Sequence, residues 1–162
     1  MFYEDVFKKL DERKIRYLVV GGFAVVFHGL VRLTVDLDLM VYLERENLLA
    51  FISAMKEIGF KPKIPINGAE FADPVKRNEW IKEKNMKVFT FCNELDDSQM
   101  VDIFIYEPID FQEANSRGIT IIRNGVKIPV ISLNDLIKLK ELAGREQDIA
   151  DVKALKQMYS EG

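Results

Sequence analysis

The residues best suited to chemistry lie between Tyr17 and Tyr42 of this 162-residue sequence. Asp36 and Asp38 are two positions apart in a run of alternating polar and apolar residues. If that run is a strand, both carboxylates lie on one face, about 6–7 Å apart at the backbone. Carboxylates in this arrangement can converge on one or two hard divalent cations, which prefer oxygen ligands. The spacing therefore predicts a divalent-metal site.

Two adjacent glycines, Gly21 and Gly22, are the second chemical feature of this stretch. They follow a short apolar run of strand length, Tyr17–Val20, and precede Phe23–His28, which is predicted to be a short buried helix. Glycines allow a ligand to approach the backbone closely, and amide groups at a helix start attract an anion such as phosphate. A phosphate cradle opposite a metal-binding carboxylate pair is the minimum equipment for phosphoryl or nucleotidyl transfer.

The stretch is therefore predicted to fold as a strand, a glycine turn, a helix and a second strand. In the second strand, the two faces are expected to carry different residues: Val35, Leu37, Leu39 and Val41 on one, and Asp36, Asp38, Met40 and Tyr42 on the other. His28, the only histidine, is either a ligand or base near the phosphate site or a helix-end residue that makes a hydrogen bond, and the second interpretation is favoured.

The ordered motif Gly21-Gly22 followed by Arg32-x-Thr34-x-Asp36-x-Asp38 resembles the signature of the polymerase-β-type nucleotidyltransferase superfamily. It looks most like the branch that contains the abortive-infection and toxin–antitoxin nucleotidyltransferases. The resemblance implies transfer of NMP from an NTP to an acceptor, with Mg²⁺ or Mn²⁺ as cofactor and release of pyrophosphate. For the toxin-type branch, it also implies an antitoxin protein as partner. The alternative is a catalytically inactive nucleotide-binding or regulatory module on the same fold.

The resemblance also implies a third aspartate on a later strand, and Asp102 is the best match. It lies in the apolar run MVDIFIY, where a carboxylate is costly to bury unless it binds a cation or hydrogen-bond donors. Asp36, Asp38 and Asp102 are therefore the expected catalytic and metal-binding residues. Asp102 is also the candidate to take the proton of the acceptor.

Other residues are expected on the nucleotide side of the site. The backbone at Gly21-Gly22 would hold the triphosphate, Thr34 would order the turn, and Arg32 would contact a phosphate or pair with an acid. A helix is predicted to begin at Ser132, and Lys140 occupies a position of its apolar stripe at which a core residue is expected. Either its stem packs while its ammonium reaches solvent, or the ammonium points into the site. The resemblance favours contact with the nucleotide.

A late helix contains Arg145-x-x-Asp148-x-x-Asp151, whose charged residues share one flank if the helix is unbroken. Two interpretations stay open for these residues. The resemblance supports a functional aspartate at position 148 or 151. The alternative is a salt-bridged pair of helices that has a structural role only.

The fold class predicted for the whole chain is α/β (α+β), with a mixed, mostly antiparallel sheet and helices packed mainly on one face. Residues 1–162 are expected to form a single nucleotidyltransferase-like domain, on which 132–159 pack as a C-terminal helical pair. Clear amphipathic helices are predicted at 2–13 and 46–58, and weaker helical character at 70–84. Strands are predicted at 87–93 and 99–106, and a hairpin at 119–131 around Asn124-Gly125.

Composition narrows the partners without identifying the acceptor. The net charge of −3 gives no general attraction to nucleic acid or membrane, and Cys92, the one cysteine, excludes an internal disulfide. No signal peptide or membrane span is visible, so a cytoplasmic location is expected. The acceptor is RNA or tRNA, a protein hydroxyl or a small molecule. Lysines and arginines around Trp80 either contact RNA or form a solvated helix face, and the second interpretation is favoured.

Overall fold

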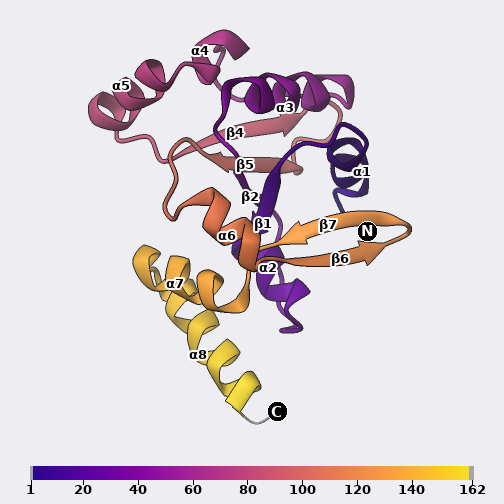
Figure 1. Ribbon diagram of the computed structural model, residues 1–162, viewed down its shortest axis with the longest axis vertical. Helices are drawn as coiled ribbons and strands as arrows, with labels where there is room; N and C mark the ends of the chain where they lie inside the picture. The colour runs from indigo at the N-terminus through magenta and orange to yellow at the C-terminus, as the bar shows by residue number, and fades with distance from the viewer. Residues whose placement is uncertain (1, 161–162) are drawn as a thin grey trace.

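The computed structural model describes residues 2–160, and its centre is a seven-stranded sheet in the order β3-β4-β5-β2-β1-β7-β6 (Figure 1). The strands are β1 Tyr17–Val20, β2 Leu37–Val41, β3 Phe60–Pro62, β4 Val88–Asn93, β5 Met100–Phe104, β6 Ile119–Arg123 and β7 Val126–Val130. Within these residues β1 pairs with β7 and β2 with β5 in parallel, and the other neighbouring strands are antiparallel. The predicted mixed, mostly antiparallel sheet is confirmed.

Eight helices surround this sheet in the described residues. They are α1 Glu4–Glu12, α2 Gly21–Phe27, α3 Arg45–Glu57, α4 Gly68–Ala72, α5 Pro74–Lys84, α6 Phe111–Arg117, α7 Leu133–Ala143 and α8 Glu146–Ser160. Figure 1 shows α3, α4 and α5 gathered beside β4 and β5, while α7 and α8 extend together away from the sheet.

Aromatic contacts define which face of the sheet the helices cover. The ring of Phe51 on α3 lies 5.6 Å from that of Phe91 on β4, and the ring of Phe71 on α4 lies 4.8 Å from that of Phe89. Trp80 on α5 stacks on Phe89 as well, at 6.3 Å. Since side chains alternate along a strand, residue 90 of β4 points to the opposite face. The helices α3, α4 and α5 therefore share one face.

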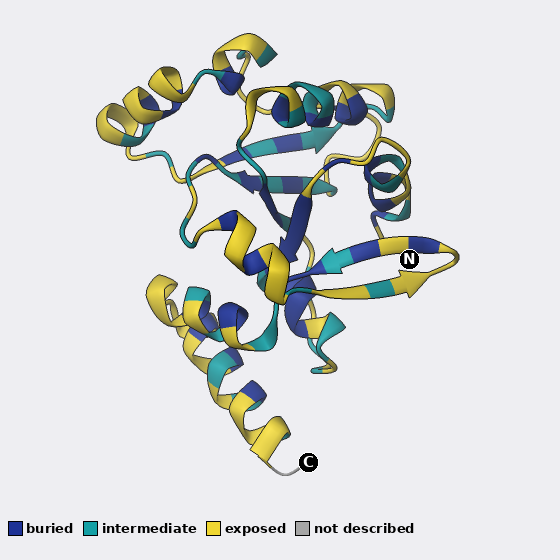
Figure 2. Ribbon diagram, viewed as in Figure 1, coloured by how far each residue is buried: buried dark blue, intermediate teal, exposed yellow. Residues whose placement is uncertain are grey.

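The opposite face is covered in part by α6, whose Phe111 ring lies 5.1 Å from the ring of Tyr42, just after β2. Figure 2 shows that burial is concentrated in the central strands and in the helix sides that face them, and β1 is buried along its whole length. The helices α3, α4 and α5 thus lie on one face as predicted, whereas α6 lies on the other and α7 and α8 extend away from the sheet.

Two boundaries differ from the sequence prediction in ways that matter for the site. Gly21 and Gly22 are the first residues of α2 and do not form a separate turn before it. The second strand begins at Leu37, so Asp36 lies in the bend before β2 and not within the predicted strand. The prediction that Asp36 lies on the face of this strand was therefore wrong, because no neighbouring strand pairs with the chain before Leu37.

The segment predicted as one weak helix at 70–84 is two helices. Asp73 ends α4 and caps α5, where its side chain accepts a hydrogen bond from the backbone N–H of Val75. Pro74 occupies the first turn of α5, where its missing N–H costs nothing. No helix in the described part of the chain is long and apolar enough to cross a membrane.

Candidate active site

Asp38 and Asp102 face each other across two neighbouring strands. Asp38 on β2 is the direct partner of Asp102 on β5 in a parallel register, and Thr90 on β4 is the antiparallel partner of Asp102. The three residues therefore form one row on the sheet face that α3, α4 and α5 leave free. Thr90 donates a hydrogen bond from Oγ1 to Oδ1 of Asp102, with a distance of 2.5 Å. One oxygen of Asp102 is thus engaged, and the other receives no hydrogen bond from residues 2–160.

Asp36 belongs to the same group although it lies outside the strand. It is exposed in the bend before Leu37, two residues ahead of Asp38. Its charge raises the pKa of both Asp38 and Asp102, so the three carboxylates are close enough to repel one another. The structure therefore brings together the three aspartates that the sequence singled out.

Burial and like charge perturb this group strongly. Burial, then the charges of Asp102 and Asp36, raise the pKa of Asp38 from 3.8 to about 7. The pKa of Asp102 is also raised, mainly by burial, while the hydrogen bond from Thr90 opposes the rise. A strongly perturbed carboxylate beside a partner of the same charge is typical of a functional site.

The donor set suits Mg²⁺ or Mn²⁺, because it consists only of carboxylate oxygens and a bound cation would relieve their mutual repulsion. Across residues 2–160, however, no three His, Cys, Asp or Glu side chains already surround a single metal position. Asp38 and Asp102 are held by the sheet, whereas Asp36 is on an irregular segment. The side chain of Asp36 would therefore be the one to adjust on binding.

The two glycines of α2 are packed directly against the motif that follows them. Gly21 has a positive φ of 64°, and a Cβ atom there would lie 2.8 Å from Cγ of Asp38. A Cβ atom on Gly22 would lie 2.9 Å from Cβ of Thr34 and 3.1 Å from Nη1 of Arg32. The start of α2 therefore touches the segment that leads into β2, and any side chain at these positions would displace Asp38 or Thr34.

Lys140 lies in a buried charge cluster between α7 and α8. Its Nζ is 2.9 Å from Oδ2 of Asp151 and 3.2 Å from Oδ1 of Asp148, and its side chain is 6% exposed. Snorkelling to solvent is therefore excluded. The ammonium charge also lowers the pKa of Asp38. Its direct contact with a nucleotide stays a prediction.

The two arginines of the predicted site each pair with one of these aspartates. Arg145 donates from Nε to Oδ2 of Asp148 at 2.7 Å, and its side chain is 78% exposed. Arg32 donates from Nη2 to Oδ2 of Asp151 at 3.1 Å. The charge of Arg145 also lowers the pKa of Asp38. Arg145 precedes α8 and does not lie within the predicted helix, whereas Asp148 and Asp151 are on α8; their pairs with Arg145 and Lys140 are the salt bridges of the structural interpretation, and a functional role for either aspartate stays a prediction.

Two other sequence interpretations are resolved by packing. His28 Nε2 lies 2.7 Å from the carbonyl oxygen of Ile131, which agrees with a helix-end residue that makes a hydrogen bond. Trp80 is 8% exposed and packs among Phe71 and Phe89, so it is a core residue and offers no ring to RNA.

Sequence reasoning missed Tyr3 and Thr90. The hydroxyl of Tyr3 donates to the carbonyl of Val35 at 2.6 Å and accepts from the backbone N–H of Met100 at 3.1 Å. It therefore joins the residue before Asp36 to the first residue of β5. Nothing in the sequence signals this contact, because Tyr3 is remote from both partners. The sequence marks Thr90 only as a polar residue in a predicted strand. Its place beside Asp102 depends on the pairing of β4 with β5.

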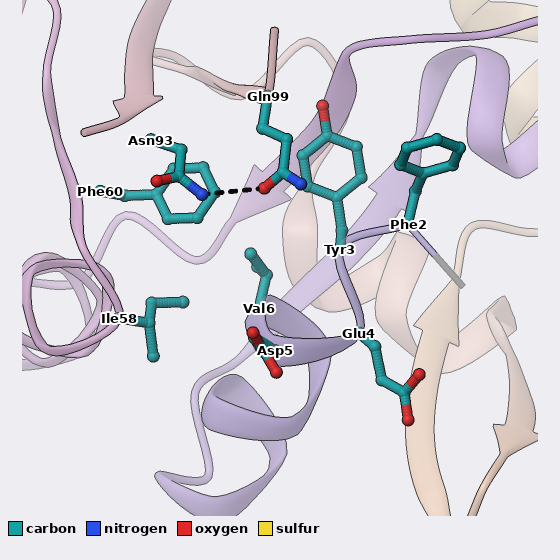
Figure 3. A pocket seen from close by; sticks show the side chains of 9 residues that line it. All are labelled: Phe2, Tyr3, Glu4, Asp5, Val6, Ile58, Phe60, Asn93 and Gln99. Atoms are coloured by element: carbon teal, nitrogen blue, oxygen red, sulfur yellow. Dashed lines mark hydrogen bonds between the residues drawn. The ribbon is translucent and has the colours of Figure 1, made fainter. Parts of the chain in front are cut away.

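A cavity of about 540 Å³ lies near Tyr3 but on the other face of the sheet (Figure 3). Its walls include Tyr3, Phe60, Asn93 and Gln99, and the side chains of Asn93 and Gln99 share a hydrogen bond of 3.0 Å. Asn93 alternates with Phe91 and Phe89 on β4, so it points to the helix-covered face. The cavity is therefore separated from Asp38 and Asp102 by the sheet.

No protein-family model and no curated protein matches the sequence. Solved structures do match the fold. The lincosamide antibiotic adenylyltransferase LnuA, solved with lincomycin bound, is 18% identical with a TM-score of 0.59 over 93% of this chain and 92% of its own. ANT(2″)-Ia, in complex with adenylyl-2″-tobramycin, is 13% identical with a TM-score of 0.60 over 96% and 86%.

A nucleotidyltransferase-like protein from Paracoccidioides brasiliensis is 18% identical, with a TM-score of 0.58 over 94% of this chain and 72% of its own. These similarities cover 93–96% of this chain and concern its fold. None of them concerns a toxin, so that branch stays a prediction. The protein has the nucleotidyltransferase fold.

Proposed function

We propose that the protein is a metal-dependent nucleotidyltransferase that moves NMP from an NTP to a hydroxyl group of an acceptor. The observation that carries this proposal is the matched register of Asp38 and Asp102 on adjacent parallel strands, with Asp36 in the bend beside them. The fold shared with antibiotic adenylyltransferases supports it.

In the proposed reaction the acceptor oxygen attacks the α-phosphorus of the NTP. A new P–O bond forms, the bond to the β,γ-pyrophosphate breaks, and pyrophosphate leaves with the electron pair. Asp102 takes the proton of the acceptor hydroxyl, and burial favours this because it raises the pKa of Asp102. Mg²⁺ or Mn²⁺, held by Asp36, Asp38 and Asp102, would stabilise the charge on the attacking and leaving oxygens.

The triphosphate is expected on the side of Asp38 where α2 begins. Gly21, the first residue of α2, lies against Asp38, and the charge of Arg145, whose side chain is 78% exposed, lowers the pKa of Asp38. An arginine with free N–H groups suits a phosphate, which it can bind through two hydrogen bonds. Lys140 would add positive charge to this side of the site. It would contact the phosphates only if its ion pair with Asp148 or Asp151 were broken.

One observation favours the alternative of a nucleotide-binding or regulatory module without turnover. Both Arg32 and Lys140, which were expected to meet the nucleotide, have aspartate partners in this structure. The presence of all three catalytic aspartates argues against this alternative, since a binding module has no need of Asp102 as a base.

The test uses purified protein, Mg²⁺ and each of the four NTPs labelled at the α-phosphate. Lincomycin and tobramycin serve as small-molecule acceptors, total cell RNA as a nucleic-acid acceptor, and casein as a source of protein hydroxyls. The expected result is transfer of label to one acceptor class, lost in Asp102→Asn. A label at the γ-phosphate should not transfer. Nucleotide binding without transfer in every arm would instead support the inactive module, and RNA or protein labelling would support a toxin-type role.

A further inference from the structure

The guanidinium of Arg32 contacts the neighbouring Leu33 and Asp151 on α8. Its Nη1 donates to the backbone carbonyl of Leu33 at 2.8 Å, and its Nη2 donates to Oδ2 of Asp151 at 3.1 Å. Its Nε lies 3.0 Å from Oδ1 of Asp151, although this N–H is not aimed at that oxygen. The side chain is 20% exposed. A guanidinium enclosed in this way has little surface left for a phosphate.

Asp151 is itself fixed from several sides. Its side chain is 2% exposed and also receives Lys140 Nζ at 2.9 Å and Gln147 Nε2 at 3.0 Å. Lys140 reaches in turn to Asp148. Because a buried carboxylate with so many donors has one well-defined position, Asp151 provides a rigid anchor on α8.

The segment that Arg32 belongs to has few other attachments. Between α2 and β2, residues 31–36 pair with no strand, and among the described residues no acceptor receives the backbone N–H groups of positions 31–35. The side chains of this segment alternate: Val31 and Leu33 are 96% and 88% exposed, whereas Arg32 and Thr34 turn toward α2. Arg32 is thus one of the few side chains that hold the segment to the protein.

This segment ends at Asp36, the one predicted metal ligand that no strand holds. Arg32 is four residues before Asp36, and Tyr3 holds the intervening Val35 carbonyl. A loop restrained at two points on one side of a ligand presents that ligand in a narrower range of positions.

We infer that Arg32 is a positioning residue, which latches the Asp36 segment to α8 through Asp151, and not a phosphate ligand. Lys140 is the buried cation that holds the anchor. This inference rests on the proposed metal site at Asp36, Asp38 and Asp102. It gives α8 a part in shaping the metal site, although α8 contributes no ligand to it.

The test is a double-mutant cycle with Arg32→Gln, Asp151→Asn and the combined variant. A second Arg–Asp pair provides matched controls, because Arg117 donates from Nε to Oδ2 of the buried Asp135 at 2.8 Å on α6 and α7. For each protein, the Mn²⁺ concentration giving half of the maximal rise in melting temperature is measured without nucleotide, followed by Kd for ATP with Mn²⁺.

If Arg32 is a latch, both single variants should need about tenfold more Mn²⁺, since supporting residues of metal sites typically contribute 10–100-fold. The double variant should lose no more than either single one, because both remove the same contact. Arg32→Lys should recover part of the loss. Arg117→Gln and Asp135→Asn should leave the Mn²⁺ midpoint unchanged. If Arg32→Gln weakens ATP while Asp151→Asn keeps wild-type Mn²⁺ and ATP binding, the latch is refuted and Arg32 is a phosphate ligand.

A second readout needs neither metal nor turnover. Trypsin cleaves after an arginine in an extended, accessible segment, and Asp151 restrains Arg32 from such an attack. Cleavage after Arg32 should be faster in Asp151→Asn than in wild type or Asp135→Asn, as followed by mass spectrometry. Equal rates would refute the latch even if the metal site is real. If Asp151→Asn is cleaved faster but Mn²⁺ does not raise the melting temperature of the wild type, the latch is supported and the metal-dependent function is rejected.

Discussion

Asp38 and Asp102 occupy the same register position on two adjacent parallel strands, although they are far apart in the sequence. Parallel pairing of β2 and β5 points both carboxylates out of the same sheet face, where helices α3, α4 and α5 are absent. Burial and, after it, the charge of Asp102 raise the pKa of Asp38, which reports the repulsion between these two carboxylates. A divalent cation is the natural means of relieving it, and the first prediction follows from this.

Saturating Mg²⁺ or Mn²⁺ should raise the melting temperature by about 5–10 °C, the size expected for a ligand at roughly 100 times its Kd on a domain of this length. ATP added with the metal should raise it further. Asp38→Asn should remove most of the metal effect, while the metal-free variant should melt at or above the wild-type temperature because one repelling charge is gone. A metal effect that survives Asp38→Asn would place the cation elsewhere.

Asp38 should also make the metal-free protein less stable as pH rises. Its pKa is raised from 3.8 to about 7 in the folded state, so between these values the folded protein holds a proton that the unfolded chain has released. The contribution of protonated Asp38 is complete below pH 3.8 and is lost as pH rises through about 7. Urea denaturation from pH 4 to 8 should therefore show a fall in the free energy of unfolding that Asp38→Asn lacks. Parallel pH profiles for the two proteins would contradict the raised pKa.

Gly22→Ala should disturb the site although alanine is the smallest possible side chain. The added Cβ would lie 2.9 Å from Cβ of Thr34, so Thr34 and its neighbour Arg32 must move. Valine should be worse than serine or alanine. The matched control is Gly68→Ala at the start of α4, where the added Cβ meets Ile52 at an ordinary 3.4 Å. ATP affinity with Mg²⁺ should fall in Gly22→Ala and stay at the wild-type value in Gly68→Ala; equal affinities in all three proteins would remove Gly22 from the site.

Thr90→Val should lower turnover while the protein stays folded. Valine keeps the shape of threonine but cannot donate to Oδ1 of Asp102, so the carboxylate loses the bond that orients it. A hydrogen bond to a charged group contributes about 1.5–3 kcal/mol, which corresponds to a loss of roughly 10–150-fold if it serves the transition state. Thr90→Ser should retain most of the rate. Thr120→Val, an exposed threonine on β6, is the control. The measurement is kcat for the acceptor identified by labelling.

Lys140→Met should destabilise the protein, whatever its effect on nucleotide binding. Removing the ammonium leaves Asp148 and Asp151 buried with less compensation, at a cost of about 3 kcal/mol, the lower end of the range for breaking a buried pair. The lower end applies because Arg145 and Arg32 remain as partners. Urea denaturation at pH 7 measures this cost. A neutral or stabilising Lys140→Met would show that the buried cluster is not needed for folding.

The site residues fall into two groups according to how they could be recognised. Asp36, Asp38, Gly21 and Gly22 were found in the sequence because they are close together in the chain and their spacing has a direct chemical meaning. Asp102 was found because a carboxylate inside an apolar strand requires a partner, and the resemblance supplied that partner. Its exact neighbour, Asp38, became clear only from the register between β2 and β5.

The amphipathic pattern of the helices and the alternation of the strands determined the fold class, because periodicity reports which face of an element is buried. Strand order and pairing between distant segments leave no such local pattern. The same is true of the contacts of Tyr3 with Val35 and Met100, and of Arg32 with Asp151. Each partner by itself is an ordinary polar residue, and only the folded chain brings the two together. Local spacing was thus enough to propose which carboxylates and glycines do chemistry, whereas the residues that hold them in place became visible only in the folded chain.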